Sequence, residues 1–206
     1  MRPDKTERIR NSMCKLYFYY GTMGSCKSML LMTTAFNMDQ RNIKTLTMKP
    51  SIDTRDGEGV IHSRVGISRK CLTFDQNEDL YALVIQIIAG FQYKDVKWIF
   101  VDECQFLTEE QVDQLSDIVD NLGINVACYG LRTDFKSKLF PGSKRLFELA
   151  DTIEEIKSTC ECGNKTIINA RIDKDGHVLK NGPQTLVGGD DRYVSMCRKC
   201  WKTKTI

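Results

Sequence analysis

Hydrophobic positions along the chain form short continuous runs that alternate with segments in which apolar residues recur at helical spacing. A short apolar run predicts a buried strand, and a recurrence every three or four residues predicts one face of a helix. The predicted strands cover residues 16–20, 44–48, 71–74, 96–103, 124–129 and 152–156. The predicted helices cover residues 27–38, 78–89, 109–121 and 143–150. Because strands and helices alternate, we expect an α/β fold with a parallel sheet covered by helices.

The first predicted strand leads into a turn that nearly matches the phosphate-binding loop G-x-x-x-x-G-K-[ST]. The residues of this phosphate loop are Gly21, Thr22, Met23, Gly24, Ser25, Cys26, Lys27 and Ser28. Such a loop surrounds phosphates with backbone N–H groups, while its lysine binds the outer phosphates and its hydroxyl binds Mg²⁺. Cys26 stands where the second glycine is expected. The motif favours nucleotide binding, with a chance strand–turn–helix as the alternative.

Two carboxylates, Asp102 and Glu103, end the buried strand that begins at residue 96, about 75 residues after Lys27. This is the position of a Walker B element, whose first carboxylate lies in the Mg²⁺ shell and whose second can accept a proton from an attacking nucleophile. The nucleophile is either water or a substrate hydroxyl. The pair therefore leaves a small-molecule kinase and an ATPase motor of the Asp-Glu-x-x helicase kind open, together with a nucleotide-binding protein without turnover.

Length and charge weaken the motor hypothesis. A helicase normally needs a second sheet domain that supplies an arginine to the nucleotide, and the 206 residues contain no second phosphate-loop-like unit. With 30 basic and 27 acidic residues, the net charge of +3 predicts no basic groove for nucleic acid. The longest apolar run is about half of what a membrane span needs, and residues 1–14 predict a charged, flexible leader without targeting signal. We expect a cytoplasmic protein.

Nine cysteines divide into five scattered singly and two close pairs, Cys160 with Cys162 and Cys197 with Cys200. This distribution favours a reducing compartment with one metal site over a disulfide framework. Four thiolates without an open position are typical of structural Zn²⁺, although four unrelated buried thiols are the alternative. We therefore divide the chain into a nucleotide-binding domain over 15–157 and a small zinc-binding domain over 158–206, with a strand over 165–172.

Two loops are candidates for ligand contact. Residues 51–70 have many charges and no period, which predicts a mobile loop whose Arg64 either reaches phosphate or is merely solvated. Residues 130–142 follow a strand's carboxyl end, where open α/β sheets bind ligands. Phe135 and Phe140 in this second loop either stack on a ligand or pin the loop to the core.

Several motifs together closely resemble bacterial thymidine kinases of the zinc-containing, vertebrate-cytosolic-like type (type II), over residues 15–201. They are Leu16-Tyr-Phe-Tyr-Tyr20, Val101-Asp-Glu-Cys-Gln-Phe-Leu-Thr108, Cys128-Tyr-Gly-Leu-Arg-Thr-Asp-Phe135, Gly188-Gly189 with Tyr193, and Cys197-Arg-Lys-Cys200. The resemblance implies a RecA-like P-loop sheet with helices on both faces. It also implies ATP-dependent phosphorylation of thymidine at its 5′-hydroxyl to give dTMP for DNA synthesis, a homotetramer, and inhibition by dTTP.

The same resemblance implies roles for individual residues. Glu103 is the general base, Asp102 lies beside Mg²⁺, and Lys27 with Ser28 holds phosphates and metal. Further residues implied on the ATP side are Arg64 and Gln105. The implied wall against the base consists of Phe106, Leu131, Phe135 and Phe140. The segment between the cysteine pairs resembles the family's lasso loop over the nucleoside, in which Tyr193 contacts the sugar and Gln184 and Asn169 take variable positions. Cys26 departs from the family pattern, which has glycine there.

Overall fold

Six parallel strands form the main sheet of the computed structural model, which describes residues 14–54, 57, 59–90, 93–182 and 192–203. The strands are β1 (Leu16–Tyr20), β2 (Thr45–Pro50), β5 (Leu72–Phe74), β6 (Trp98–Val101), β7 (Asn125–Gly130) and β8 (Thr152–Glu155). Their order across the sheet is β5-β2-β6-β7-β1-β8, with every pairing parallel. The predicted α/β fold is confirmed, since all six predicted strands are present with ends that differ by a few residues.

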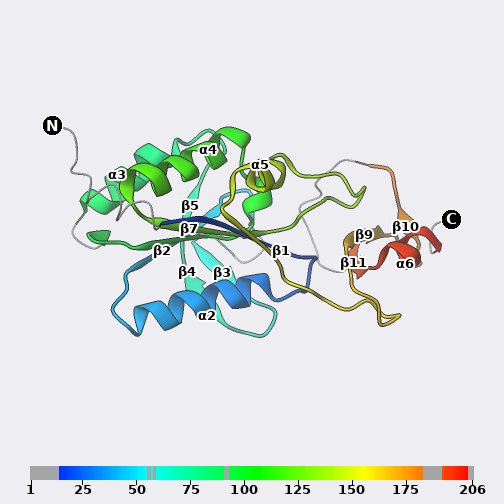
Figure 1. The fold of residues 1–206 in the computed structure, drawn as a ribbon. Helices are drawn as coiled ribbons and strands as arrows, with labels where there is room; N and C mark the ends of the chain where they lie inside the picture. The colour runs from blue at the N-terminus through cyan, green and yellow to red at the C-terminus, as the bar shows by residue number, and fades with distance from the viewer. Residues whose placement is uncertain (1–13, 55–56, 58, 91–92, 183–191, 204–206) are drawn as a thin grey trace.

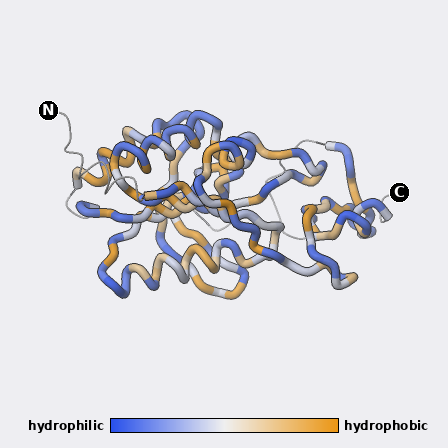
Figure 2. The backbone as a smooth tube through the Cα atoms, viewed as in Figure 1, coloured by the Kyte–Doolittle hydropathy of each residue, from blue (hydrophilic) through white to orange (hydrophobic). Residues whose placement is uncertain are grey.

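Helices cover both faces of this sheet (Figure 1). Helix α2 (Lys27–Asp39) lies on one face. On the other face lie α3 (Leu80–Ala89), α4 (Glu109–Asp117) and α5 (Pro141–Leu149). Each face has its own cluster of buried apolar side chains, and Figure 2 shows the hydrophobic positions running through the sheet between these helices. Because β1, β6 and β7 pair in parallel, their carboxyl ends lie at the same edge of the sheet.

Local caps explain where the helices on the second face begin. The Thr108 hydroxyl accepts a hydrogen bond from Gln111 N at 3.1 Å, and the Gln111 side chain accepts one from Thr108 N at 3.3 Å. This capping box is the one that the sequence predicts for α4. The Asp79 carboxylate accepts from Ala82 N at 3.0 Å and caps α3 in the same way. After Asp117 the helix continues as a π-helical turn, Ile118–Leu122. This turn ends at Gly123, whose φ is 64°.

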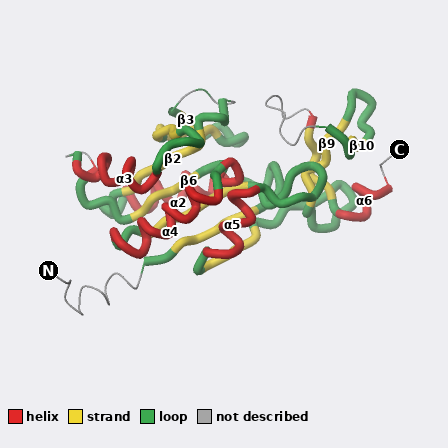
Figure 3. Tube along the Cα trace, turned by 90° about the horizontal axis from the view of Figure 1, so that it is seen from above, coloured by secondary structure: helices red, strands yellow, loops and turns green. Residues whose placement is uncertain are grey.

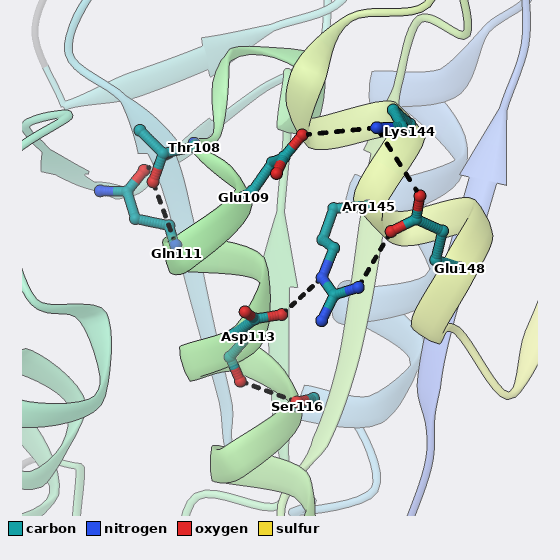
Figure 4. A network of polar contacts seen from close by, with 8 residues as sticks. All are labelled: Thr108, Glu109, Gln111, Asp113, Ser116, Lys144, Arg145 and Glu148. Carbon is teal, nitrogen blue, oxygen red and sulfur yellow. Dashed lines mark hydrogen bonds and ion pairs between the residues drawn. The ribbon is translucent and has the colours of Figure 1, made fainter.

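Ion pairs join α4 to α5 on the protein surface (Figure 4). The Arg145 guanidinium contacts Asp113 at 2.7 Å and Glu148 at 2.9 Å, and Lys144 lies 3.9 Å from Glu109. Because these side chains are half exposed, solvent screens them and they add little to stability. Apolar packing holds α5 in place, and its Ser143 hydroxyl donates to Leu131 O at 2.6 Å.

The expectation of an irregular loop over residues 51–70 is wrong for residues 60–70. Strands β3 (Val60–His62) and β4 (Ser68–Lys70) form an antiparallel hairpin there. Arg69 attaches it to the main domain, because its guanidinium contacts Asp39 at 2.7 Å and donates to Thr47 Oγ1 at 3.0 Å. Both strands are short, and β4 consists of Ser68, Arg69 and Lys70 without any apolar residue, so the hydrophobic pattern could not indicate the hairpin.

A second, antiparallel sheet follows the main domain. This C-terminal sheet consists of β10 (Val178–Leu179), β9 (Ile168–Ile172) and β11 (Tyr193–Met196), in that order. Figure 3 shows it beyond the end of the main sheet, next to α6 (Arg198–Thr203), a helix that the sequence analysis did not predict. Its buried apolar cluster is small and includes Cys160 and Cys197. Among the described residues, no helix is long and apolar enough to cross a membrane.

Candidate functional site

The phosphate loop joins the end of β1 to α2 and approaches its neighbours closely. A Cβ at Gly21 would lie 2.6 Å from the carbonyl of Ile156, so only glycine fits there. The Lys27 ammonium is buried and donates to Thr22 O at 2.8 Å, which folds it back over the loop. Gly24 and Cys26 both have left-handed backbone angles, with φ values of 74° and 64°. Glycine adopts this conformation without steric cost, whereas the Cβ of cysteine makes it unfavourable.

The carboxylates Asp102 and Glu103 follow β6 directly and face the loop. Burial, and then the negative charge of Glu103, raises the pKa of Asp102 to about 7, while a hydrogen bond with the Ser28 side chain acts in the opposite direction. Ser28 and Asp102 thus lie close together and line the same cavity, where both could hold one Mg²⁺ ion. A bound divalent cation would favour the ionised form of Asp102.

Glu103 has an unusual backbone, with φ 51° and ψ 37°. A non-glycine residue in this region is strained, and such strain is frequent at functional sites. The Gln105 amide donates to Glu103 Oε2, and its own carbonyl oxygen accepts from Leu131 N at 2.9 Å. Gln105 is buried and links the carboxylate to the end of β7. These contacts place Gln105 beside Glu103, which itself lines the cavity with Lys27 and Ser28.

A cavity of about 260 Å³ lies between the phosphate loop and the two carboxylates. Its lining includes Lys27, Ser28, Asp102, Glu103, Arg64 and Leu131. The hairpin β3–β4 brings Arg64 to the loop, since its Nη1 atom lies 3.5 Å from the position of a Cβ on Gly24. The cavity therefore combines cations, a hydroxyl and carboxylates in an arrangement suited to a magnesium–nucleotide.

The aromatic residues named as ligand contacts in the sequence belong to three segments, and none of them is among the cavity-lining residues. The rings of Phe106 and Phe140 meet edge to face with centroids 6.0 Å apart. Phe135 is fully buried, and the Arg171 guanidinium lies 3.7 Å from its ring centroid. Arg171 also donates to the Tyr193 hydroxyl, at 2.7 Å from Nη2. Phe135 is thus covered by Arg171, which joins it to Tyr193.

The four paired cysteines come together, as their spacing predicts. Their sulfur atoms all lie within 4.8 Å of one another, and Cys162 Sγ is 3.6 Å from Cys197 Sγ. A tetrahedral site with Zn–S bonds of about 2.3 Å separates its sulfurs by about 3.8 Å. All nine cysteines lie in the described part of the chain, and each is a free thiol. Hydrogen bonds from the backbone and side chain of Asn164 lower the pKa of Cys162 to about 6, whereas hydrogen bonds with Cys162 and Cys197 raise the pKa of Cys200 to about 12. A bound zinc ion would favour the thiolate form of all four cysteines. The cluster fits structural zinc.

Comparison with known proteins agrees with this geometry. The thymidine kinase family model matches residues 14–201. The chain is 45% identical to a thymidine kinase of Mannheimia succiniciproducens, over 94% of this chain and 97% of that protein. It is 46% identical to a thymidine kinase of Agrobacterium fabrum, over 92% of this chain and 96% of that one. The chain belongs to the thymidine kinase family.

The cysteine cluster fits the zinc-containing type of this family. Among solved structures, the chain is similar to the Pif1 helicase from Candida albicans, with a TM-score of 0.42 and 14% identity. That likeness covers 77% of this chain and 40% of the helicase, and no functional inference follows from it.

Within this thymidine kinase fold, one site combines residues that are distant in the sequence. Five residues of the phosphate loop share the cavity with Asp102, Glu103, Arg64 and Leu131; they are Met23, Gly24, Cys26, Lys27 and Ser28. Gln184 lies outside the described residues, as do Gly188 and Gly189. Two residues of the region had no sequence signal: Asp53, a buried cavity residue whose Oδ2 lies 3.5 Å from Lys49 Nζ, and Arg171, which bridges Phe135 and Tyr193. Neither residue belongs to a motif, so only their positions in space reveal them.

Proposed function

We propose that this protein is a thymidine kinase that transfers the γ-phosphate of ATP to the 5′-hydroxyl of thymidine. The observation that carries the proposal is the family match over residues 14–201, together with a cavity that joins the phosphate loop to Asp102 and Glu103. The two substrates, ATP and thymidine, follow from the proposal. The kinase hypothesis is favoured over the motor because the relatives of known name are thymidine kinases.

On the donor side, the N–H groups of the phosphate loop and the Lys27 ammonium bind the β- and γ-phosphates. Mg²⁺ bound with ATP neutralises charge on these phosphates. Ser28 and Asp102 would hold this ion, because they lie close together beside the loop. Arg64 lies within reach of the same phosphates, at the mouth of the cavity. When ATP enters, Lys27 exchanges its bond with Thr22 O for a phosphate oxygen.

On the acceptor side, Glu103 takes the proton of the thymidine hydroxyl during in-line transfer. Gln105 fixes the Glu103 carboxylate in position through its amide. Phe106, Leu131 and Phe140 provide the wall against the thymine ring, and Phe135 supports it from beneath Arg171. Tyr193 contacts the sugar, and the segment between the cysteine pairs covers the nucleoside. Excluding water there would protect ATP from hydrolysis.

The proposal extends to properties of the whole protein. The chain divides into a nucleotide-binding domain over 15–157 and a zinc-binding domain over 158–206, in which zinc joins the two ends of the lasso segment. The proposal includes a cytoplasmic location, and also a homotetramer and inhibition by dTTP, which are what the resemblance of the sequence implies. Light scattering tests the tetramer, and titration of the transfer reaction with dTTP tests the inhibition.

A phosphate-transfer assay tests the activity. The protein is incubated with Mg²⁺, thymidine and ATP labelled at the γ-phosphate, and labelled dTMP is measured. Single-stranded DNA is added to a parallel ATPase assay. Transfer to thymidine without stimulation by DNA supports the kinase, and DNA-stimulated hydrolysis without transfer supports the motor instead. If neither activity is detected, the result supports a nucleotide-binding protein without turnover.

A further inference from the structure

The C-terminal sheet holds the phosphate loop by both polar backbone groups of Met23. We propose that Ser195 and Asn169 of this sheet are positioning residues for ATP, so that the cysteine-linked domain acts on the phosphate donor as well as on the nucleoside. The inference rests on the proposed function in so far as it takes the loop to be the ATP site. It assigns these two side chains a role toward ATP, although they lie in the segment proposed to cover the nucleoside.

Two neighbouring strands supply the contact. Ser195 on β11 is paired in register with Asn169 on β9, so their side chains leave the same face of the sheet. Asn169 Oδ1 accepts a hydrogen bond from Met23 N at 2.7 Å. The Ser195 hydroxyl donates to Met23 O at 2.6 Å. One cross-strand pair therefore fixes the N–H and the C=O of a single loop residue.

The preceding residue of the loop has a contact of the same kind. Thr22 Oγ1 lies 2.8 Å from Thr166 Oγ1, and both side chains are buried. Because the Thr166 hydroxyl already donates its proton to Ser158 O at 3.1 Å, Thr22 is the donor to Thr166. Asn169 also donates to Thr133 O at 3.3 Å, which adds the loop after β7 to the same network.

These external bonds have a physical consequence for nucleotide binding. A loop that binds phosphate through backbone N–H groups needs those groups aligned before the ligand arrives, since ordering them on binding costs affinity. Within the loop, Ser25 N donates to Thr22 O at 3.2 Å, whereas Met23 is held from outside. Ser195 lies two positions before Cys197 in the chain, so the cysteine cluster fixes the strand that carries this contact.

The test measures equilibrium binding of a non-hydrolysable ATP analogue with Mg²⁺, and separately KM for ATP and for thymidine. We expect Ser195→Ala to weaken analogue binding about fivefold, the effect of one lost hydrogen bond, with KM for thymidine changed by less than about twofold. Ser195→Thr keeps the hydroxyl and restores binding. The matched control is Ser116→Ala on α4, which removes a hydroxyl-to-carbonyl bond of 2.7 Å far from the loop and leaves both values unchanged.

Thr166→Val provides a second variant that keeps the shape of the side chain, and we expect it to weaken analogue binding as Ser195→Ala does. The inference is overturned if both variants, Ser195→Ala and Thr166→Val, fold and bind the analogue as tightly as the wild type does. An equal rise in both KM values would also overturn it, because that is the result of general loosening. If the wild type binds the analogue but transfers no phosphate to thymidine, the proposed function fails while this test still stands.

Discussion

Replacing Cys26 by glycine tests whether the departure from the phosphate-loop motif strains the backbone. Cys26 has φ 64° and ψ 26° and immediately precedes α2. Its side chain is exposed, and its sulfur lies 4.0 Å from Gly24 O, so little packing is lost with it. Glycine adopts this conformation without steric cost. The substitution therefore removes the steric conflict of a Cβ and leaves the fold of the loop unchanged.

The expected gain follows from two opposing effects. A left-handed conformation costs a residue other than glycine about 1–2 kcal/mol. Glycine in turn loses about 0.5–1 kcal/mol more backbone entropy on folding. The difference is a stabilisation of about 0.75 kcal/mol, which in a domain of this size raises Tm by about 1.5–3 °C. Without the Cβ, phosphate can also approach the loop more closely, so we expect higher turnover or a lower KM for ATP.

The assay compares the wild type with Cys26→Gly and Cys26→Ala in thermal unfolding and in steady-state kinetics with ATP. The alanine variant is the matched control, because it removes the thiol but keeps the Cβ and hence the strain. We expect only the glycine variant to melt higher than the wild type. Equal melting temperatures for the two variants would show that the loop tolerates a Cβ and that the strain argument is wrong. Kinetics no better than wild type in Cys26→Gly would contradict the effect on phosphate binding.

Three further predictions concern other parts of the site. Glu103→Gln should lower thymidine phosphorylation at least about a hundredfold while leaving binding of an ATP analogue nearly intact, and near-normal turnover would remove Glu103 as the base. Zinc chelation or Cys197→Ser should weaken thymidine binding, measured by calorimetry, at temperatures below the melting of the main domain; unchanged affinity would contradict the role of the metal. Gly130→Ala should destabilise the protein by about 1–3 kcal/mol in urea unfolding and reduce turnover, because its Cβ would lie 2.6 Å from Cys104 Sγ and from Gln105 Oε1; wild-type stability would show that Gln105 can move.

Much of the fold follows from local patterns in the sequence. The buried runs that become β1, β6 and β7 are continuous and apolar because parallel strands are covered on both faces, and such a run needs no information from elsewhere in the chain. The capping box at Thr108 is equally local, since its two bonds join residues three apart. The paired cysteines were also predictable, because the geometry of zinc restricts the spacing of its ligands.

The position of the hairpin β3–β4 was not predictable in this way. Its strands are three residues long, and their place depends on the bonds of Arg69 to Asp39 and Thr47, which lie more than twenty residues away in the chain. The polar links of the site are of the same kind. Gln105 bonds Leu131, Arg171 bonds Tyr193, and these residues share no motif.

By itself, the sequence determined the phosphate loop, the carboxylates after β6 and the cysteine pairs, because each is a short pattern in which neighbouring residues act together. It also marked Cys26 as a departure, without saying what backbone it would have. Only the tertiary structure decided that Cys26 is left-handed and that Ser195 and Asn169 hold Met23. The physical reason is that a hydrogen bond between residues 172 positions apart depends on how two sheets pack, and no local pattern encodes that packing.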